Sequence, residues 1–325
     1  MATRKEVADY AGVSVATVSN VVNRTKYVSD EVRQRVEEAI KQLDYRPNMI
    51  ARSLATKETR HVAIMVDNLK NGYYTEMLEG AQSLASEHGY IVSIILNDFT
   101  DKEETLGIAS RGLDGVILTN VEAKEIQKKM NQKICMTQYD LKVEVDYKKG
   151  IFDAVNSLKQ HGHKDIGFLS GLRLSDDGSH PRWDCFRDAC KKSGIDINLE
   201  FIVDANERQT TDEDAGVEAV RRLFARKTRP TAFIAVNDLM AIGAIRELNR
   251  CGFKVPEDIS VIGCDNSQAS KYYTPSISSI DASVFELGRS MMSNLISAIK
   301  GEELKNTVIA SKYIERESVA DVLIK

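Results

Sequence analysis

Residues 12–23 read GVSVATVSNVVN, and the spacing of their valines decides the fold of the amino-terminal segment. So many valines, with a threonine among them, favour a β-strand by composition. A half-buried strand, however, requires apolar and polar residues to alternate, and here they do not. Val18, Val21 and Val22 instead stand at i, i+3 and i+4, on one face of a helix. The stretch therefore predicts a helix with a valine stripe turned inward and Ser14 as its N-cap.

One further helix is predicted before this one and another after it. Thr3 and Glu6 fit a capping box that opens a helix running to about Tyr10, and Gly12 ends it. Ser29 begins a third helix. Its apolar stripe is Val32, Val36, Ala39, Ile40 and Leu43. Two short helices joined by a tight glycine-containing turn and followed by a third describe a helix-turn-helix.

The outward face of the valine helix carries side chains that a DNA major groove accepts. With the stripe turned inward, the residues left outside or at the edge are Val15, Ala16, Thr17, Ser19 and Asn20. Small side chains allow close approach, hydroxyls suit phosphates and methyl groups suit thymine. The alternative, on these residues alone, is a three-helix cap with a solvated polar face.

Composition and charge are those of a soluble globular chain of two or three domains. The 325 residues are 42% apolar and 28% charged, and no run approaches the roughly 18 apolar residues that cross a bilayer. MATRKEVADY lacks the apolar core of a secretory signal, so we expect a cytoplasmic protein. Residues 1–60 hold 11 basic and 8 acidic residues, and the remainder holds 33 and 40. A basic amino-terminal segment on an otherwise acidic chain is expected if only that segment binds a polyanion.

From His61 onward, short apolar runs alternate with helical stretches. HVAIMVD (61–67) and YIVSIIL (90–96) read as strands, with a helix over 74–89 between them. Further apolar runs begin at Asp114, Lys133, Asp165, Thr231 and Ile259. Strands alternating with helices indicate an α/β class with parallel sheets that are covered on both faces.

Two amino-terminal motifs resemble the LacI/GalR family of bacterial repressors. VADYAGVSVATVSNVVN (7–23) matches the family's VAxxAGVSxxTVSxVxN, and YRPNMIARSLA (45–55) matches its YRPNxxARxL hinge. The resemblance implies an all-α helix-turn-helix DNA-binding domain over residues 1–47 and a hinge helix and linker over 48–59. Residues 60–325 would then form a two-lobed domain that binds an effector and dimerises. That body would resemble a periplasmic binding protein, with two doubly wound α/β lobes.

The resemblance also assigns roles on DNA. Val15, Ala16 and Asn20 take base-reading positions. The positions that touch or adjoin phosphates are Ser14, Thr17, Ser19, Asn23, Tyr27, Ser29, Tyr45 and Asn48. Leu54, with Ala51 beside it, would enter the minor groove from a hinge helix over 48–56. NMIARSL is too short to be a stable helix by itself, so its folding should be coupled to dimerisation on DNA.

Motifs along the body extend the resemblance to an effector cleft between the lobes. HGHKDIGFLSG (161–171) and VPEDISVIGCDN (255–266) match family patterns, and crossovers between lobes are expected near Asp146, Ser279 and Ala310. By position, the cleft would be lined by Tyr73, Tyr74, Asp146, Arg182, Asn237 and Asp265. Trp183 either stacks on a ligand ring or packs as an anchor within its lobe.

The chemistry of these side chains favours a sugar or sugar derivative. Asp and Asn bond paired hydroxyls, Arg forks onto two oxygens, and aromatic faces cover apolar C–H patches. A purine or nucleoside corepressor is the alternative. No cofactor or metal is expected, and whether the ligand induces or corepresses stays open.

Several positions depart from the family pattern. Gly72 stands where the family usually has proline, Cys185 takes a glycine position, and Cys264 takes an aromatic position. Asn266 replaces an aspartate, and the segment before Asp114 is a few residues short. The rim of the first lobe is therefore remodelled, and no relative's ligand transfers to this chain.

Other classes of function fit less well. The chain has no GxxxxGK[ST] loop and no GxSxG elbow, so we expect no enzyme. His161 and His163 form a turn more readily than half a metal site, and the five cysteines, without CxxC spacing, should be free thiols. A transport-type solute-binding protein lacks the sixty DNA-binding residues. The expected partners are double-stranded operator DNA, a small effector and a second subunit, with no membrane. Bound to its operator, the protein would associate with the nucleoid.

Asn20 generates the first prediction. Relatives commonly carry arginine there, which forks onto guanine, whereas asparagine suits the N6 and N7 atoms of adenine. We expect the preferred half-site to lack that guanine and to regain it in the Asn20→Arg variant, as measured by selection from random operator libraries. Identical preferences for both proteins would leave Asn20 touching only phosphate or water.

Overall fold

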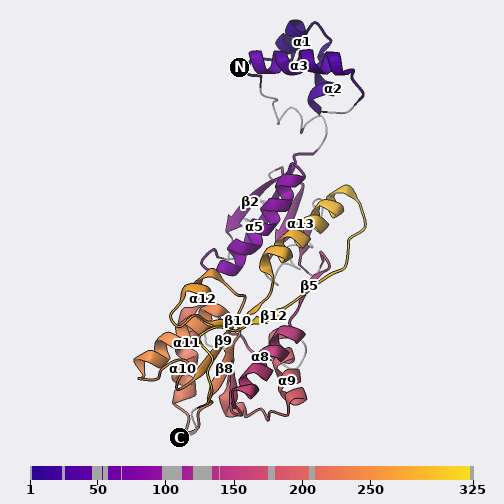
Figure 1. Cartoon of the computed structure of the whole chain (residues 1–325). Coiled ribbons are helices and arrows are strands. Elements are labelled where there is room, and N and C mark those ends of the chain that lie inside the picture. Colours follow the sequence, from indigo (N-terminus) through magenta and orange to yellow (C-terminus); the bar gives the residue numbers. More distant parts are fainter. Residues whose placement is uncertain are drawn as a thin grey trace. The chain divides into compact units, whose positions relative to one another are not determined.

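The computed structural model describes residues 2–23, 26–45, 53, 58–66, 68–96, 112–119, 134–138, 140–174, 180–204 and 209–322. Contacts between residues divide the chain into two units, Met1–Arg60 and His61–Lys325. Each unit is described by itself, and Figure 1 labels the elements of both.

In residues 2–45, as far as they are described, the amino-terminal unit has three helices: α1 (Arg4–Ala11), α2 (Val15–Asn23) and α3 (Asp30–Gln42). The predicted capping box opens α1, because Thr3 Oγ1 accepts from the Glu6 amide at 3.3 Å and Glu6 Oε2 accepts from the Thr3 amide at 2.7 Å. Gly12 ends α1 in the left-handed region with φ 64°, which a residue without Cβ adopts at little cost. The predicted helix boundaries are confirmed to within about one residue.

The core of this unit confirms that the valine-rich stretch is a helix. Val18 is fully buried beside Val7 and Val36, while Val21 and Val22 are half-buried against the same cluster. Val15, in the first turn and at the edge of this stripe, is 44% exposed. The period of the burial is therefore helical, and the β-propensity of valine is overridden by packing.

The first lobe of the body contains a four-stranded parallel sheet. Its strands are β1 (His61–Val66), β2 (Ile91–Leu96), β3 (Gly115–Leu118) and β4 (Ile134–Thr137), in the order β2-β1-β3-β4. Two helices, α5 (Gly72–Glu87) and α13 (Val284–Lys300), lie side by side and pack on this lobe although some 200 residues separate them in sequence (Figure 1). The strands predicted from His61 to Lys133 are confirmed.

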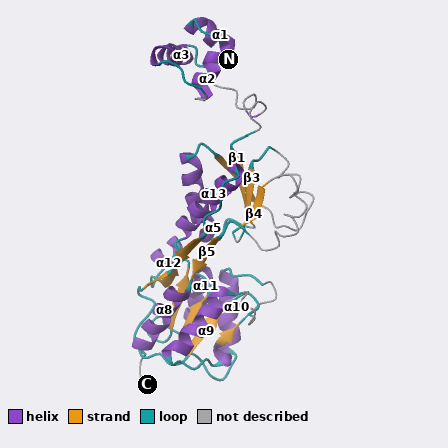
Figure 2. Ribbon diagram, turned by 90° about the vertical axis from the view of Figure 1, so that its right-hand side faces the viewer, coloured by secondary structure: helices purple, strands orange, loops and turns teal. Residues whose placement is uncertain are grey.

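The second lobe contains a six-stranded sheet in the order β12-β10-β9-β8-β6-β7, parallel except for β12. The strands are β6 (Ile166–Leu169), β7 (Ile202–Val203), β8 (Ala232–Ala235), β9 (Ser260–Cys264), β10 (Ser278–Asp281) and β12 (Lys312–Ile314). The helices are α8 (Lys148–Gln160), α9 (Pro181–Ser193), α10 (Glu213–Phe224), α11 (Asp238–Arg250) and the short α12 (Gln268–Tyr272), with a 3₁₀ turn at Leu199–Phe201. Figures 1 and 2 show α8 and α9 on one side of this sheet and α10 and α11 on the other, as a doubly wound fold requires.

Three crossings connect the lobes. The chain enters the second lobe after β5 (Val143–Asp146), returns after β10 to α13, and crosses again between β11 (Thr307–Ala310) and β12. β5 and β11 pair in parallel, with Asp146 opposite Ala310. These positions confirm the predicted crossovers at Asp146, Ser279 and Ala310.

Glycines allow α5 and α13 to approach closely. A Cβ on Gly80 would lie 2.0 Å from the carbonyl oxygen of Phe285, and one on Gly288 would lie 1.9 Å from that of Met77. Real Cβ atoms do not approach backbone so closely, so each helix needs a glycine where the other crosses it. This contact fastens the returning helix to the first lobe.

Among the described residues, the structure contains no helix that is both long enough and apolar enough to cross a membrane.

The α5–α13 contact predicts a stability effect. We expect Gly80→Ala to destabilise the protein by about 1–3 kcal/mol, since the helices must move apart to admit a methyl group. Urea denaturation measures the change, and Gly72→Ala in the same helix is the control. A Cβ on Gly72 meets nothing closer than 3.9 Å, so we expect a change within about 0.5 kcal/mol. Equal stability of the Gly80 variant and the wild type would contradict the close crossing.

Candidate functional site

Hydroxyl side chains cap the start of α2 and continue along its outward face. Ser14 Oγ accepts from the Thr17 amide at 3.0 Å and lies 2.8 Å from Thr17 Oγ1. Ser19 Oγ accepts from Asn23 Nδ2 at 3.2 Å one turn further on. Val15 and Ala16 are exposed at the amino end of the helix, and Asn20 is half-buried. The helix thus presents short side chains and hydroxyls along one side.

The other predicted DNA-contacting residues fall into three groups. Tyr27 is 92% exposed, and Ser29 is exposed at the start of α3, where its side chain makes no capping bond. Tyr45 is only 7% exposed and belongs to the core of the helical unit, and its place next to phosphate stays a prediction. The remaining three lie outside the described residues: Asn48, Ala51 and Leu54.

In the body, three polar side chains from different elements meet around Arg182, which is partly buried. Arg182 Nη2, in the first turn of α9, donates to Asp265 Oδ1 at 2.8 Å and to Tyr147 Oη at 2.9 Å. The guanidinium carbon also lies 4.6 Å from the centre of the Tyr147 ring, within cation–π range. Tyr147 follows β5, Arg182 lies beyond β6 and Asp265 follows β9. All three therefore lie at the carboxyl ends of strands, where open α/β sheets bind ligands.

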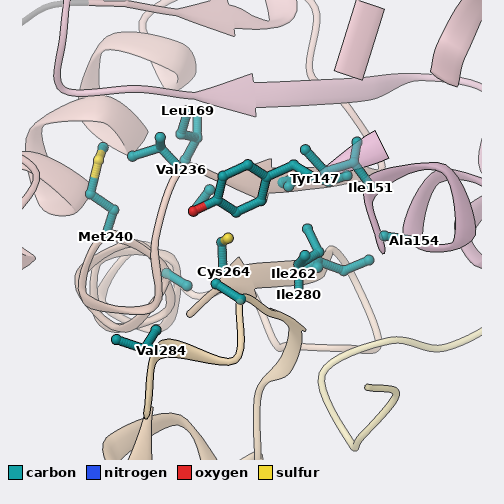
Figure 3. Close-up of a cluster of buried hydrophobic side chains, with 14 of the residues drawn as sticks. Tyr147, Ile151, Ala154, Leu169, Val236, Met240, Ile262, Cys264, Ile280 and Val284 are labelled. Atoms are coloured by element: carbon teal, nitrogen blue, oxygen red, sulfur yellow. The ribbon is translucent and has the colours of Figure 1, made fainter. Parts of the chain in front are cut away.

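Tyr147 was not among the predicted cleft residues. It occupies the asparagine position of the family pattern xxDNxxG, here EVDYKKG. Figure 3 shows its ring among Leu169, Val236, Met240 and Cys264, at the ends of the central strands. Burial raises the pKa of its hydroxyl well above the ordinary range, so the phenol stays protonated. Cys264, which takes an aromatic position of the family pattern, lies in the same buried cluster as the Tyr147 ring.

Asp265 is held in a strained loop. Its φ is 102° and that of Asn266 is 56°, both in the region that favours glycine. The Asp265 amide donates to the Ile280 carbonyl at 2.8 Å, and the Asn266 amide donates to Ser279 Oγ at 3.0 Å. Burial raises the pKa of Asp265 to about 7, although Arg182 lowers it. The loop thus fixes a carboxyl group that can change its charge near neutral pH.

Asp238 is a second buried carboxyl group that the sequence did not single out. It is 1% exposed, and it accepts from Ser279 Oγ at 2.6 Å and from the Ser267 amide at 2.7 Å. Burial raises its pKa. Asp238 therefore ties the start of α11 to β10 and to the loop that carries Asp265.

Asn237 and Asp146 make backbone contacts. Asn237 Oδ1 caps α11 by accepting from the Met240 amide at 2.9 Å, and its Nδ2 donates to the Thr211 carbonyl at 2.9 Å. Asn237 is 4% exposed, so its amide serves mainly to join two loops. Asp146 is half-buried, and its Oδ1 accepts from the Lys148 amide at 3.0 Å. This bond does not use the second oxygen, Oδ2. Asp146 is the more accessible of these two predicted contacts.

The two tyrosines of the first lobe lie at the start of α5. Their rings meet edge to face with centroids 5.6 Å apart, and both are half-buried against the main core. Asn71 caps the helix by accepting from the Tyr73 amide at 3.0 Å. A Cβ on the adjacent Gly72 would lie 3.9 Å from Cβ of Ser267 in the second lobe. The start of α5 therefore meets the second lobe beside the predicted cleft.

Trp183 packs inside the second lobe. It is 6% exposed, and its ring lies 5.5 Å from that of Phe168 and 5.8 Å from that of Phe186. This packing favours the anchor interpretation over stacking on a ligand.

Among the described residues, no group of three or more His, Cys, Asp or Glu side chains could hold a metal ion. His161 Nδ1 lies 2.8 Å from Asp321 Oδ1, while His163 is buried against Thr231, Ser260 and the Ala320 carbonyl. These contacts belong to the turn between α8 and β6, as the sequence predicts.

Two family models match the chain. Residues 3–48 match "Bacterial regulatory proteins, lacI family", and residues 155–319 match "Periplasmic binding protein-like domain". The chain is 32% identical to the HTH-type transcriptional repressor PurR of Pectobacterium carotovorum subsp. carotovorum (strain PC1), covering 99% of this chain and 98% of that protein. It is 31% identical to catabolite control protein A of Priestia megaterium, covering 94% of each.

Solved structures agree with this fold. The lac repressor dimer bound to operator and the anti-inducer ONPF matches with a TM-score of 0.79, at 23% identity, over 98% of this chain and 99% of that one. The transcriptional regulator CelR–cellobiose complex matches with a TM-score of 0.71, at 26% identity, over 98% and 100%. The chain therefore belongs to the lacI family of bacterial regulatory proteins and is a ligand-responsive, DNA-binding transcriptional repressor.

Proposed function

We propose that this repressor binds a near-palindromic operator as a homodimer and releases it when a small sugar enters the cleft between its lobes. One observation carries the ligand part of the proposal: Arg182, Asp265 and Tyr147 meet at the carboxyl ends of three strands. A guanidinium beside a carboxyl group bonds neighbouring hydroxyls of a sugar well, because one donates two hydrogens and the other accepts. Tyr73 and Tyr74 add aromatic faces from the other lobe.

A purine or nucleoside corepressor is the second candidate. The relatives named PurR support it, as do the half-buried tyrosine rings at the start of α5. The sugar class is supported by the hydroxyl-binding polar groups and by the similarity to the CelR–cellobiose complex. Neither class requires a cofactor.

The edge of the first lobe supports a dimer. β2 is an edge strand, and its side chains Ile91, Ile94 and Leu96 are 66%, 49% and 58% exposed. An exposed apolar edge strand favours pairing with another chain unless something covers it. A second copy covering this edge would place the two first lobes together and pair the two DNA-binding units.

The mechanism couples the cleft to DNA through the crossings. Two α2 helices would read successive major grooves about one helical turn apart, and hinge helices over 48–56 would bend the DNA between them. A ligand that closes the cleft moves the first lobe, from which the linker leaves through β1. If the ligand favours the state with separated hinges, it induces; if it favours the state with adjacent hinges, it corepresses. The sugar assignment favours induction.

Leu54 tests the hinge. We expect Leu54→Ala to weaken operator binding strongly, by about tenfold or more, because a wedge that stabilises the kinked duplex is lost. Fluorescence anisotropy with a labelled operator measures this, and the binding of effector to the free protein should not change. Unaltered operator affinity would refute the hinge assignment.

Arg182 tests the cleft. We expect Arg182→Ala to abolish the release of operator by effector while DNA binding is retained, because the cleft loses its fork of donors. Arg187→Ala, in the same helix, is the matched control, since Arg187 pairs with Asp184 outside this polar group. A variant without Arg182 that still responds to effector would exclude the cleft assignment.

A further inference from the structure

Two buried side-chain nitrogens at the start of α9 have no hydrogen-bond partner among the described residues. They are Nδ1 of His180 and Nε of Arg182. His180 is the residue before the helix and is only 8% exposed. Buried polar groups in native proteins are nearly always paired, so two such groups within three residues require an explanation.

The backbone at the same place also offers donors that bond no acceptor among the described residues. α9 begins with Pro181, which has no N–H, and the side chain of His180 makes no capping bond. The first N–H groups of a helix have no partner within it, so those of Arg182 and Trp183 are available to an acceptor outside. The start of α9 thus has several donors that bond no acceptor among the described residues.

Ser170, at the carboxyl end of β6, determines the tautomer of His180. Ser170 Oγ donates to the Leu172 carbonyl at 3.1 Å and accepts from the Leu172 amide at 3.1 Å. Its hydrogen is already used, so in its long contact of 3.5 Å with His180 Nε2 the imidazole must be the donor. Burial lowers the pKa of His180, with a smaller effect from Arg182, so the ring is neutral. Nδ1 therefore carries a lone pair that accepts.

Covalent geometry keeps that acceptor close to the donors. Nδ1 is bonded to Cγ, so it stays beside the backbone of residues 180–182 while Nε2 points to Ser170. One acceptor and several donors at one place fit a hydroxyl group, which donates one hydrogen bond and accepts two. A carboxylate or phosphate only accepts, so it would leave Nδ1 unpaired, and it would enter a cleft that already contains Asp146 and Asp265.

We propose that His180 is an effector-contacting residue and that its Nδ1 accepts a hydrogen bond from a hydroxyl group of a polyol ligand. The inference rests on the proposed function, since Arg182, two residues further on, would place this hydroxyl in the same cleft as Asp265 and Tyr147. It adds a residue that the sequence did not indicate and specifies the chemical group that the start of α9 binds.

The free protein provides the first test, with His163 as the matched control. His163 is also buried, but its nitrogens lie 2.9 Å from Thr231 Oγ1, 3.0 Å from Ser260 Oγ and 3.0 Å from the Ala320 carbonyl. We expect His163→Leu to lower Tm by several degrees, because those contacts are lost. His180→Leu should lower Tm less than His163→Leu does, since its Nδ1 has no partner to lose and only the long contact of Nε2 with Ser170 disappears. Equal losses of Tm in the two variants would overturn the proposal.

Ligand binding provides the second test. Wild type is screened by thermal shift against ribose, glucose, galactose, cellobiose, adenosine and hypoxanthine, and the affinity of each stabilising compound is measured by calorimetry. We expect His180→Leu to weaken binding of that compound about tenfold. His180→Asn, whose side-chain oxygen replaces Nδ1 as an acceptor, should bind within about threefold of wild type.

The outcomes separate this proposal from the function on which it rests. If a hydroxyl-bearing compound binds wild type and His180→Leu equally, His180 has no contact with the effector, and the proposed function stands. If only hypoxanthine stabilises the protein, the polyol assignment is overturned, and the purine alternative holds. If none of the compounds stabilises wild type, the sugar cleft and the role of His180 fail together.

Discussion

The fold of the body depends on one constraint: the chain must cross between its two lobes three times. Each crossing leaves a strand at its carboxyl end, at Asp146 after β5, Asp281 after β10 and Ala310 after β11. The residues beside these crossings are therefore close to both lobes. Any change in the angle between the lobes alters the surroundings of Tyr147 and of the loop at Asp265. A ligand that contacts these residues is bound where the two lobes are joined.

The polar residues at this junction are expensive to bury, and the structure offsets that cost by pairing them. Asp238 accepts two hydrogen bonds, and Arg182 bonds both Asp265 and Tyr147. In a site of low dielectric, such bonds are stronger than in water, and an unpaired group is costlier. These hydrogen bonds hold the side chains of the junction in place. A ligand that binds there exchanges its hydrogen bonds to water for hydrogen bonds to the protein.

Much of the fold follows from local sequence signals, because those signals depend on neighbours within one turn or one strand. The capping box at Thr3 and Glu6 and the valine stripe of α2 are examples, and the alternation of strands and helices is another. The candidate cleft is less accessible to such reasoning. Asp238 is recognised only through Ser279, which lies 41 residues away in sequence but hydrogen-bonds to it. Successive helix residues point about 100° apart, so Trp183 packs in the core while the neighbouring Arg182 bonds Asp265 and Tyr147.

A family pattern predicts which sequence positions match a motif better than it predicts which side chains those residues contact. Tyr45 begins the hinge motif, and the fold adds that its ring lies in the core of the helical unit. Tyr147 and Cys264 each depart from the pattern, and both belong to one buried cluster. A single sequence shows both departures, but only the fold shows that the two side chains lie together.

The central claim is that one equilibrium links the cleft to the operator, and reciprocity tests it most directly. The affinity for operator is measured by fluorescence anisotropy with and without saturating effector, and the affinity for effector is measured by calorimetry with and without operator. Linkage predicts that both affinities change by the same factor, about 5- to 150-fold for a coupling of ordinary size. An effector that binds the cleft tightly and leaves operator affinity unchanged would contradict the account.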